Sequence, residues 1–239
     1  MKELTIQTIA DFAGGVLLSG DPLATCASVS TDSRKIQPGE LFVALVGDRF
    51  DAHDFLTQVA QAGPGALLVS RIPAEPASLG CALIKVDDTL LALQSLARRH
   101  RELLAPLVIG ITGSNGKTST KDFTAAVMRP AFEVLATLGN LNNHIGVPLT
   151  LLALDERHRC AIVEMGMNHP GEIAPLAAMA QPDAAIITNI GVAHIEHMGS
   201  RHGIALEKGV LAEAVNPGGV VVLNANDDMS PEIAQRCRA

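Results

Sequence analysis

The chain has 239 residues, of which 48% are hydrophobic and 18% charged, and its formal net charge is −7. A buried core is therefore expected, while the absence of a Lys/Arg block and of Trp and Tyr argues against general nucleic-acid binding. No apolar run reaches the roughly 18 residues of a membrane helix, so no span is expected. The N-terminal residues lack a signal-peptide pattern, which favours a cytoplasmic location. The four cysteines are widely spaced and are expected to be reduced thiols.

The first hundred residues predict a small α/β unit. Apolar periodicity distinguishes its helices from its strands, and Pro-Gly and Gly-Pro-Gly segments mark its turns. Pro106 closes its last helix. In chain order we expect a helix over 5–13, a strand over 41–45, a helix over 54–62, strands over 66–70 and 82–86, and a helix over 89–104.

After Pro106 the pattern changes to strand–loop–helix units. Apolar strands separated by helical stretches predict a mostly parallel sheet that is covered on both faces. The fold class is thus α/β, with a small first domain over 1–100 and a second, mostly parallel-sheet domain over 101–239. The chain ends soon after a strand, so we expect it to be shorter than a complete enzyme. The expected strands are 107–111, 134–136, 160–164, 184–188 and 219–223, and the expected helices are 121–128, 204–215 and one starting at 230.

A Gly-rich segment at 110–118 lies between a predicted strand and a predicted helix, which is the setting of a phosphate-binding loop. Backbone N–H groups and the helix N-terminus would hold phosphate oxygens. Lys117 would neutralise the β- and γ-phosphates, and the Thr118 hydroxyl would ligate Mg²⁺. In the usual pattern, four residues separate the first glycine from the Gly-Lys pair. Here Ile111 follows Gly110, and the spacing differs from that pattern by one residue. The alternative is an ordinary Gly-rich turn.

Two further positions follow predicted strands. Glu164 ends an apolar strand, and ligands of open α/β sheets bind beyond the carboxyl ends of strands. Its carboxylate could hold Mg²⁺ opposite Thr118, or it could be a solvated strand-end residue. His194, Glu196 and His197 could suggest zinc, although two histidines without a third ligand are weak evidence. Alternatively, these residues line a loop or cap a helix.

The Gly-Ser-Asn-Gly-Lys-Thr segment at 113–118 resembles the loop of Mur ligases and folylpolyglutamate synthases. Within that superfamily, the segments 137–150 and 164–173 resemble those of the Mur ligases that add D-alanyl-D-alanine. Ligases that add earlier residues carry Ser-Ser after the glutamate instead. The resemblance extends over nearly the whole chain.

The resemblance implies an ATP site with two Mg²⁺ ions. His194 resembles a magnesium-site histidine, and Lys208 matches a lysine whose amine is carbamylated by carbon dioxide. The chain has Lys208-Gly209-Val210 where the family commonly has Lys-Gly-Glu. Catalytic roles are expected for Lys117, Glu164, His194 and Lys208, metal binding for Thr118, Glu164, His194 and Lys208, nucleotide binding for Gly113, Ser114, Asn115, Gly116, Lys117, Thr118, Ser119 and Asn189, and substrate binding for Ser33, Arg34, Asn140, Asn142 and Asn143.

The Asp-Ser-Arg turn at 32–34 resembles the UDP-sugar-binding domain of the same ligases. Arg34 supplies a rigid donor fork for phosphate, and Ser33 supplies a hydroxyl. The alternative is a polar turn whose Asp32–Arg34 contacts are structural only. Where the family has Asp-Gly-His, this chain has Ala52 in place of the glycine. A positive φ at Ala52 would cost free energy.

The resemblance implies a ligase that joins UDP-N-acetylmuramoyl-tripeptide to D-alanyl-D-alanine with ATP, through an acyl phosphate. We expect a monomer without nucleic-acid partners. The family's C-terminal ligase domain is expected to be absent here, so this chain would turn over slowly. The alternatives are a P-loop kinase or ATPase and a non-catalytic nucleotide- or UDP-sugar-binding module.

Overall fold

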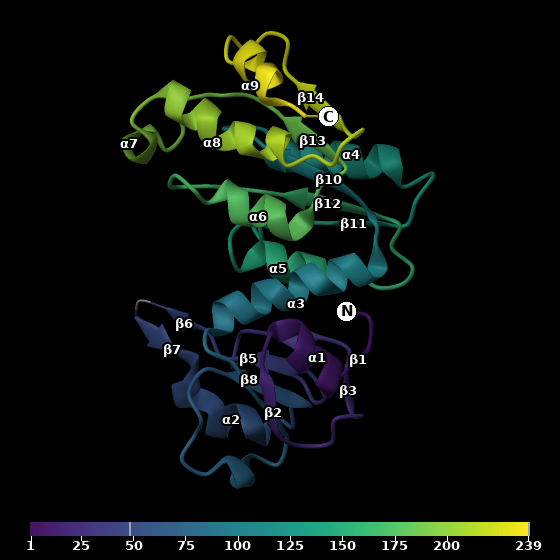
Figure 1. Cartoon of the computed structure of the whole chain (residues 1–239), viewed down its shortest axis with the longest axis vertical. Coiled ribbons are helices and arrows are strands. Elements are labelled where there is room, and N and C mark those ends of the chain that lie inside the picture. Colours follow the sequence, from purple (N-terminus) through teal and green to yellow (C-terminus); the bar gives the residue numbers. More distant parts are fainter. Residues whose placement is uncertain (48, 239) are drawn as a thin grey trace. The chain divides into compact units, whose positions relative to one another are not determined.

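The computed structural model describes residues 1–47 and 49–238. The chain divides into two compact units, Met1–His100 and Arg101–Ala239 (Figure 1). Within the described residues, no helix is long and apolar enough to cross a membrane.

The first unit is built on a five-stranded sheet in the order β2-β9-β8-β5-β4. The strand β2 is antiparallel to its neighbour, and the other pairs are parallel. Two short ribbons, β1 with β3 and β6 with β7, accompany the sheet. The strands are β1 (Leu4–Thr5), β2 (Val16–Ser19), β3 (Thr25–Cys26), β4 (Val29–Ser30), β5 (Leu41–Val43), β6 (Val46–Gly47), β7 (Phe50–Asp51), β8 (Ala66–Val69) and β9 (Ala82–Lys85), and the helices are α1 (Ile6–Ala13), η1 (Ala52–Phe55), α2 (Leu56–Gln61), η2 (Pro76–Leu79) and α3 (Thr89–Leu104).

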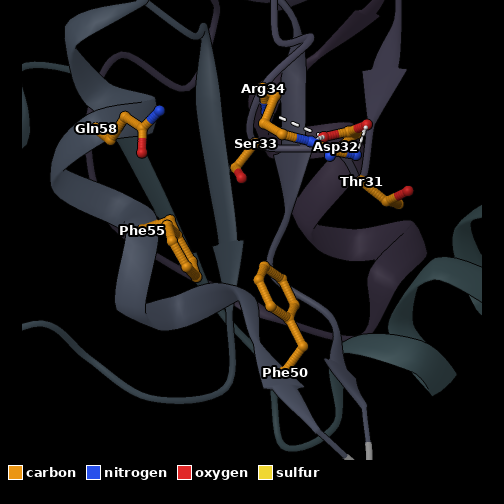
Figure 2. Close-up of a pocket in the computed structure, with 7 residues that line it drawn as sticks. All are labelled: Thr31, Asp32, Ser33, Arg34, Phe50, Phe55 and Gln58. Atoms are coloured by element: carbon orange, nitrogen blue, oxygen red, sulfur yellow. Dashed lines mark hydrogen bonds and ion pairs between the residues drawn. The ribbon is translucent and has the colours of Figure 1, made fainter.

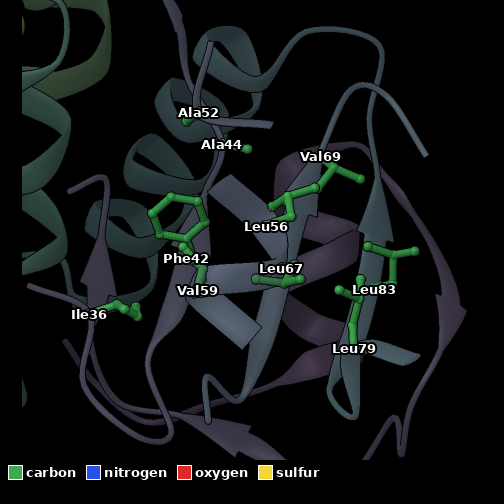
Figure 3. Packing of buried hydrophobic residues seen from close by; sticks show 10 residues of the cluster. All are labelled: Ile36, Phe42, Ala44, Ala52, Leu56, Val59, Leu67, Val69, Leu79 and Leu83. Atoms are coloured by element: carbon green, nitrogen blue, oxygen red, sulfur yellow. The ribbon is translucent and has the colours of Figure 1, made fainter. Parts of the chain in front are cut away.

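One hydrophobic core of the first unit lies between the sheet and α2. Phe42, Leu67 and Leu83 come from three neighbouring strands and meet Leu56 and Val59 of α2 (Figure 3). All five side chains are buried, and burial of such side chains stabilises a fold by about 1.5–3 kcal/mol each. This core holds the short strands in place and with them the turns at their ends.

The second unit contains a five-stranded parallel sheet in the order β11-β12-β10-β13-β14. The side chains of Ile109 and Ile111 belong to the core with Ala125 of α4, whereas Gly110 faces Leu211 of α8. Helices therefore cover both faces, which confirms the predicted architecture. The strands are β10 (Leu107–Thr112), β11 (Val134–Ala136), β12 (Cys160–Glu164), β13 (Ala184–Ile187) and β14 (Val220–Leu223), and the helices are α4 (Lys117–Met128), α5 (Gly146–Leu152), α6 (Ile173–Ala180), α7 (Ile195–Met198), α8 (Arg201–Glu213) and α9 (Ser230–Arg236).

Several element boundaries differ from the sequence prediction. The expected 54–62 helix is divided into η1 and α2, because the Asp51 carboxylate caps the His53 amide and starts a tighter 3₁₀ turn. The helix expected over 204–215 already begins at Arg201, where Ser200 accepts a hydrogen bond from the Gly203 amide. Ala52 is buried at the start of η1 and is not among the residues with positive φ. The anticipated strain at that alanine is therefore not present.

Candidate functional site

The phosphate-loop residues occupy the carboxyl end of the central strand β10. Gly113 has φ of +149° and Gly116 has φ of +77°, so both adopt conformations that favour glycine. A Cβ atom at Gly113 would lie 1.8 Å from the Thr188 hydroxyl oxygen, which leaves no space for a side chain. Two glycines thus allow the chain to turn sharply between β10 and the first residue of α4.

The loop is fastened to the segment that follows β13. The amides of Ser114 and Asn115 donate to the backbone and side-chain oxygens of Asn189, both at 2.9 Å. The Gly191 amide donates to Ser114 Oγ at 2.9 Å, and the Thr188 hydroxyl donates to the Asn115 carbonyl at 2.6 Å. The predicted nucleotide residues Ser114, Asn115 and Asn189 are therefore brought together, and Asn189 acts here by holding the loop.

Lys117 begins α4, and its ammonium group donates to the Gly113 carbonyl at 2.9 Å. The amine therefore lies over the loop, where phosphate oxygens would be expected at a helix N-terminus. Ser119 is exposed in the first turn of the same helix. The expected grouping of Gly113, Gly116, Lys117 and Ser119 around one helix start is consistent with a phosphate cradle.

Glu164 is only 2% exposed at the end of β12, so the alternative of a solvated strand-end carboxylate is wrong. Its Oε2 accepts a hydrogen bond from the Thr118 hydroxyl at 3.0 Å, and its Oε1 accepts one from the Asn142 amide group at 2.8 Å. The Glu164 backbone amide donates to Thr137 Oγ1 at 3.0 Å. The carboxylate is thereby fixed opposite the phosphate loop.

The Thr118–Glu164 pair meets the requirements of a magnesium site. Mg²⁺ takes hard oxygen ligands, and proteins usually hold it with one or two carboxylates together with substrate phosphates. Among residues 1–47 and 49–238, no three His, Cys, Asp or Glu side chains form a metal-binding group. The zinc interpretation of the histidine segment therefore gains no support, whereas a magnesium ion completed by phosphate oxygens fits the donors present.

The three residues of that segment have different surroundings. His194 caps α7 with φ of +63° and is partly buried. His197 is exposed, lies 4.0 Å from the Glu196 carboxylate, and packs its ring against His169 with centroids 4.3 Å apart. His194 thus remains the candidate that combines a special backbone conformation with partial burial.

Lys208 lies on α8 with 1% of its surface exposed, so the alternative of a solvated helix lysine is wrong. Burial, together with the charge of Lys117, lowers the pKa of Lys208 to about 8, against the opposing effect of Glu207. A lysine with such a pKa is partly neutral near physiological pH, and only the neutral amine is a nucleophile.

The sequence analysis did not identify the residues that hold the segment after β13. The Asp227 carboxylate accepts a hydrogen bond from the Ile190 amide, and Arg201 donates to the Ile190 carbonyl at 2.9 Å. Arg201 also pairs with the Asp228 carboxylate at 2.6 Å. One feature of the sequence could have indicated these residues. The polar segment 224–228 directly follows a predicted strand, and residues of a binding site are expected at that end of a strand.

The three predicted asparagines have separate roles in the structure. Asn142 holds Glu164, as described above, and its carbonyl accepts a hydrogen bond from the Gly166 amide at 2.8 Å. Asn143 Oδ1 accepts from the Gly146 amide at 2.8 Å at the start of α5. Asn140 is exposed. Asn142 is therefore engaged with the carboxylate, while Asn143 and Asn140 lie nearer to solvent.

The first unit contains a cavity of about 610 Å³ beside the Asp-Ser-Arg turn (Figure 2). Arg34 donates from Nε and from a terminal nitrogen to the two Asp32 oxygens, both at 2.9 Å. Hydrogen bonds from the Arg34 side chain and backbone lower the pKa of Asp32 to about 2. The cavity is lined by Thr31, Asp32, Ser33, Arg34, Phe50, Phe55 and Gln58.

Two aromatic residues of this cavity were not predicted from the sequence. The rings of Phe50 and Phe55 are stacked, with centroids 4.9 Å apart and an interplanar angle of 16°. Phe50 is 53% exposed and offers an apolar surface near the arginine fork. The cavity thus combines a charged donor group with an aromatic wall.

Comparison with known proteins places this geometry in a family. The model of the Mur ligase middle domain matches residues 111–239. The UDP-N-acetylmuramoyl-tripeptide–D-alanyl-D-alanine ligase of Escherichia coli is 42% identical over 228 residues, which is 95% of this chain. The ligase of the same name from Bacillus subtilis is 45% identical over 224 residues, which is 93% of this chain. The match covers 49% of each relative.

Solved structures agree with the sequence relatives. A MurF crystal structure from Acinetobacter baumannii matches with a TM-score of 0.93 and 37% identity, over 100% of this chain and 52% of that chain. The MurF ligase of Thermotoga maritima in complex with ADP matches with a TM-score of 0.80 and 30% identity, over 88% and 48%. The chain spans about half the length of the curated relatives it matches. It belongs to the Mur ligase family.

Proposed function

We propose that this chain supplies the nucleotide- and UDP-sugar-binding parts of an ATP-dependent ligase that joins UDP-N-acetylmuramoyl-tripeptide to D-alanyl-D-alanine. The observation that carries the proposal is the Thr118–Glu164 pair, which sets a fixed carboxylate opposite a Gly-Lys-Thr loop. The names of the E. coli and B. subtilis relatives supply the substrates. In this reaction the tripeptide carboxylate takes up the γ-phosphoryl group, and the dipeptide amine then displaces phosphate.

Each loop residue has a role that follows from its position. Lys117 and the N–H groups at the start of α4 would hold the phosphates and offset the charge that develops during transfer. Thr118 and Glu164 would hold Mg²⁺, with His194 as the candidate ligand for a second ion. Bound there, magnesium ions would polarise phosphoryl oxygens. Asn142 keeps the Glu164 carboxylate oriented by donating to its second oxygen.

Carbamylation of Lys208 is a further part of the proposal. The neutral amine would attack carbon dioxide, forming a nitrogen–carbon bond and releasing one proton to solvent. Together with the earlier loss of one proton from the ammonium form, this step would change the side chain from a cation to an anion. Burial and the nearby Lys117 charge favour the neutral amine that this step requires. The product would be attracted to Lys117 and to a bound cation.

The cavity beside Arg34 is the proposed UDP-sugar site. The guanidinium group can donate to phosphate oxygens in a forked geometry, and Ser33 lines the same cavity. The stacked ring of Phe50 would offer a face to a nucleobase. A volume of about 610 Å³ is within the usual range for a small-molecule pocket. A cytoplasmic location and a monomeric state belong to the same proposal.

The test combines binding with turnover. Calorimetry should detect ATP with Mg²⁺ and, separately, UDP-N-acetylmuramoyl-tripeptide. Mass spectrometry should then detect the ligated product only when ATP, the tripeptide substrate and D-alanyl-D-alanine are all present. Phosphate release that does not depend on the dipeptide would favour a kinase or ATPase. Binding of both ligands without any product, even in a protein of the relatives' full length, would favour a non-catalytic binding module.

A further inference from the structure

A buried lysine lies about one turn beyond the phosphate-loop residues, and the proposed site does not account for it. Lys121 belongs to α4, three residues after Thr118, and its side chain is buried. Lysine is almost never fully buried unless its ammonium group is paired. The partners of this ammonium group therefore indicate its role.

The ammonium group of Lys121 donates to the Thr137 carbonyl at 2.8 Å and lies 2.9 Å from an oxygen of Asp122. The Asp122 side chain is exposed, so solvent screens this ion pair and its energy is small. The Thr137 carbonyl, in contrast, belongs to a buried residue that directly follows β11. The bond to Thr137 is thus the contact that determines where the buried end of Lys121 lies.

The backbone departs from the regular strand pairing at Thr137. Its amide donates to the Ile162 carbonyl at 3.0 Å, which continues the parallel pairing of β11 with β12 by one residue. In a regular parallel ladder, the Thr137 carbonyl would then accept from the Glu164 amide. Instead, the Thr137 hydroxyl accepts from that amide at 3.0 Å, and the carbonyl accepts from Lys121. The lysine therefore holds the Thr137 carbonyl out of the ladder.

This arrangement connects the two partners of the Glu164 carboxylate. Thr118 donates to one carboxylate oxygen and lies three residues before Lys121 on the same helix. Asn142 donates to the other oxygen and lies five residues after Thr137, in the segment that leaves β11. Lys121 thus joins the helix that carries one partner to the segment that carries the other.

We propose that Lys121 is a positioning residue for the metal-binding carboxylate of Glu164, which it orients through the Thr137 peptide group. The inference rests on the proposed function, in which Thr118 and Glu164 hold Mg²⁺. Removal of a group that holds a metal ligand in place typically lowers metal affinity by roughly 10–100-fold. Lys121 has this effect through the groups that fix the carboxylate, and not by contact with the nucleotide.

Direct phosphate binding is a less suitable role for Lys121. The ammonium group of Lys117 already lies over the loop, where it donates to the Gly113 carbonyl. Lys121 is about one turn further along α4, and its ammonium group is bonded to the carbonyl at the end of β11. To reach a phosphate it would have to leave that buried carbonyl without a partner, which costs free energy.

The experiment measures how much Mg²⁺ strengthens nucleotide binding. Calorimetry gives the dissociation constant of the β,γ-imido analogue of ATP, which resists hydrolysis, once with Mg²⁺ and once with EDTA. The ratio of the two constants reports the metal site, because the measurement in EDTA is the metal-free reference for each protein. Lys121→Met keeps the apolar stem without the ammonium group. We expect its ratio to be about tenfold lower than that of the wild type, and its affinity in EDTA to stay within about twofold.

Thr137→Val tests the next step between Lys121 and Glu164. Valine keeps the branched shape but removes the hydroxyl that accepts from the Glu164 amide. That amide can then bond to the carbonyl of residue 137, as in a regular ladder, so the variant should remain folded. We expect a similar fall of the ratio, and little further fall in the double variant, because residues in one hydrogen-bond network are not additive.

Lys85→Met is the matched control. Lys85 also donates to a backbone carbonyl, that of Val86 at 2.7 Å, and lies 3.9 Å from the exposed carboxylate of Asp87, but it belongs to the first unit. This variant should keep the full effect of Mg²⁺. Asp122→Asn should keep it too, because it removes only the screened ion pair. Urea unfolding of all variants measures whether each is folded.

The outcomes separate the positioning role from the function. An unchanged ratio in folded Lys121→Met would overturn the role, and so would equal losses of affinity with Mg²⁺ and with EDTA. If that variant did not fold, Thr137→Val decides, since an unchanged ratio there overturns the role and a lower ratio supports it. Losses that multiply in the double variant would also contradict the connection through Thr137. A wild type whose binding does not respond to Mg²⁺ would instead count against the proposed function.

Discussion

The phosphate loop of the second unit and the Asp-Ser-Arg turn of the first differ in what holds their polar groups. In the loop, Ser114, Asn115 and Thr118 are each bonded to residues at the end of β12 or in the segment after β13, at least 46 positions away in the sequence. In the turn, the Arg34 fork is held by Asp32, only two residues before it. The Arg34 side chain is 80% exposed, whereas Glu164, opposite the loop, is 2% exposed.

This difference indicates two ways of preparing a binding site. Long-range bonds fix the loop before any ligand arrives, so little conformational entropy is lost on binding. The exposed arginine keeps only a local partner, and a phosphate would have to replace or share that partner. Solvent screens the Asp32–Arg34 pair, so its contribution to stability is small. Changes to loop residues that contact or bond to distant segments should therefore affect folding and binding together, while changes in the turn should affect binding alone.

The largest effect is expected for Gly113→Ala. The substitution places a Cβ 1.8 Å from the Thr188 hydroxyl and forces alanine into φ of +149°. The backbone conformation alone costs on the order of 1–3 kcal/mol. We expect a lower free energy of unfolding in urea and loss of ATP binding. Adding Thr188→Ala should restore part of the stability by removing the clash. An unchanged unfolding midpoint in the single variant would show that the loop is not rigid.

A smaller effect is expected for Lys117→Ala. Its ammonium group lies over the loop, so its removal should weaken ATP binding by about 1.5–3 kcal/mol, the range for hydrogen bonds to charged groups. Stability should change little, because the side chain is partly exposed. The control is Arg129→Ala, which removes an exposed cation at the other end of α4. Nucleotide titration that gives equal affinities for wild type and Lys117→Ala would remove this lysine from the site.

A comparison of the wild type with Lys208→Met tests whether burial of this charged side chain lowers the free energy of unfolding. Its pKa is lowered from 10.5 to about 8, so the unfolded chain binds the proton more tightly than the folded one. This destabilisation is fully present below pH 8 and disappears as the pH rises towards 10.5. Between pH 7 and 10 the wild type should gain about 2 kcal/mol relative to Lys208→Met.

The comparison is made by urea unfolding in buffers free of carbon dioxide, because a carbamate would alter the proton balance. Both proteins contain the same cysteines, whose titration cancels in the difference. A difference in unfolding free energy that stays constant from pH 7 to 10 would show that Lys208 is not destabilised by burial. Repeating the series in bicarbonate should reduce the pH dependence of the wild type but not that of the variant.

Sequence reasoning identified the strands and loops of the second unit because its parallel strands are continuous apolar runs. The strand 134–136 and the strand 160–164 have the predicted bounds. Short strands such as β1, β3 and β4 were missed, since two residues carry no readable periodicity.

The candidate site was less accessible to sequence reasoning than the fold. Local patterns identified Lys117, Thr118 and Glu164, because each follows or ends an apolar strand. The burial of Glu207 and its bonds to two amides at the start of α6 depend on helix packing, which no local pattern encodes. The same holds for Arg201, which bonds to Ile190, eleven residues earlier, and to Asp228, twenty-seven residues later. Contacts between distant segments required the structure.

The smallest effect is expected in the first unit. Arg34→Ala should weaken binding of UDP-N-acetylmuramoyl-tripeptide by about 1–3 kcal/mol, because a charged donor to phosphate is lost. The free energy of unfolding should stay within about 0.5 kcal/mol of the wild type, as is usual for exposed positions. Calorimetry and urea unfolding measure the two quantities on the same samples. Arg34→Lys keeps the charge but not the fork, so it should recover only part of the affinity.

Arg157→Ala is a suitable control for this last variant. Arg157 is 77% exposed and pairs with Asp155, again two residues before it, at the surface of the second unit. The two arginines thus share exposure and local pairing, but they differ in that Arg34 lines the cavity beside the Asp-Ser-Arg turn. If both substitutions left tripeptide binding unchanged, the Arg34 pair would be a structural turn and no part of the site. A selective loss in Arg34→Ala, with both proteins equally stable, would show that an exposed arginine with only a local partner can serve binding without contributing to the fold.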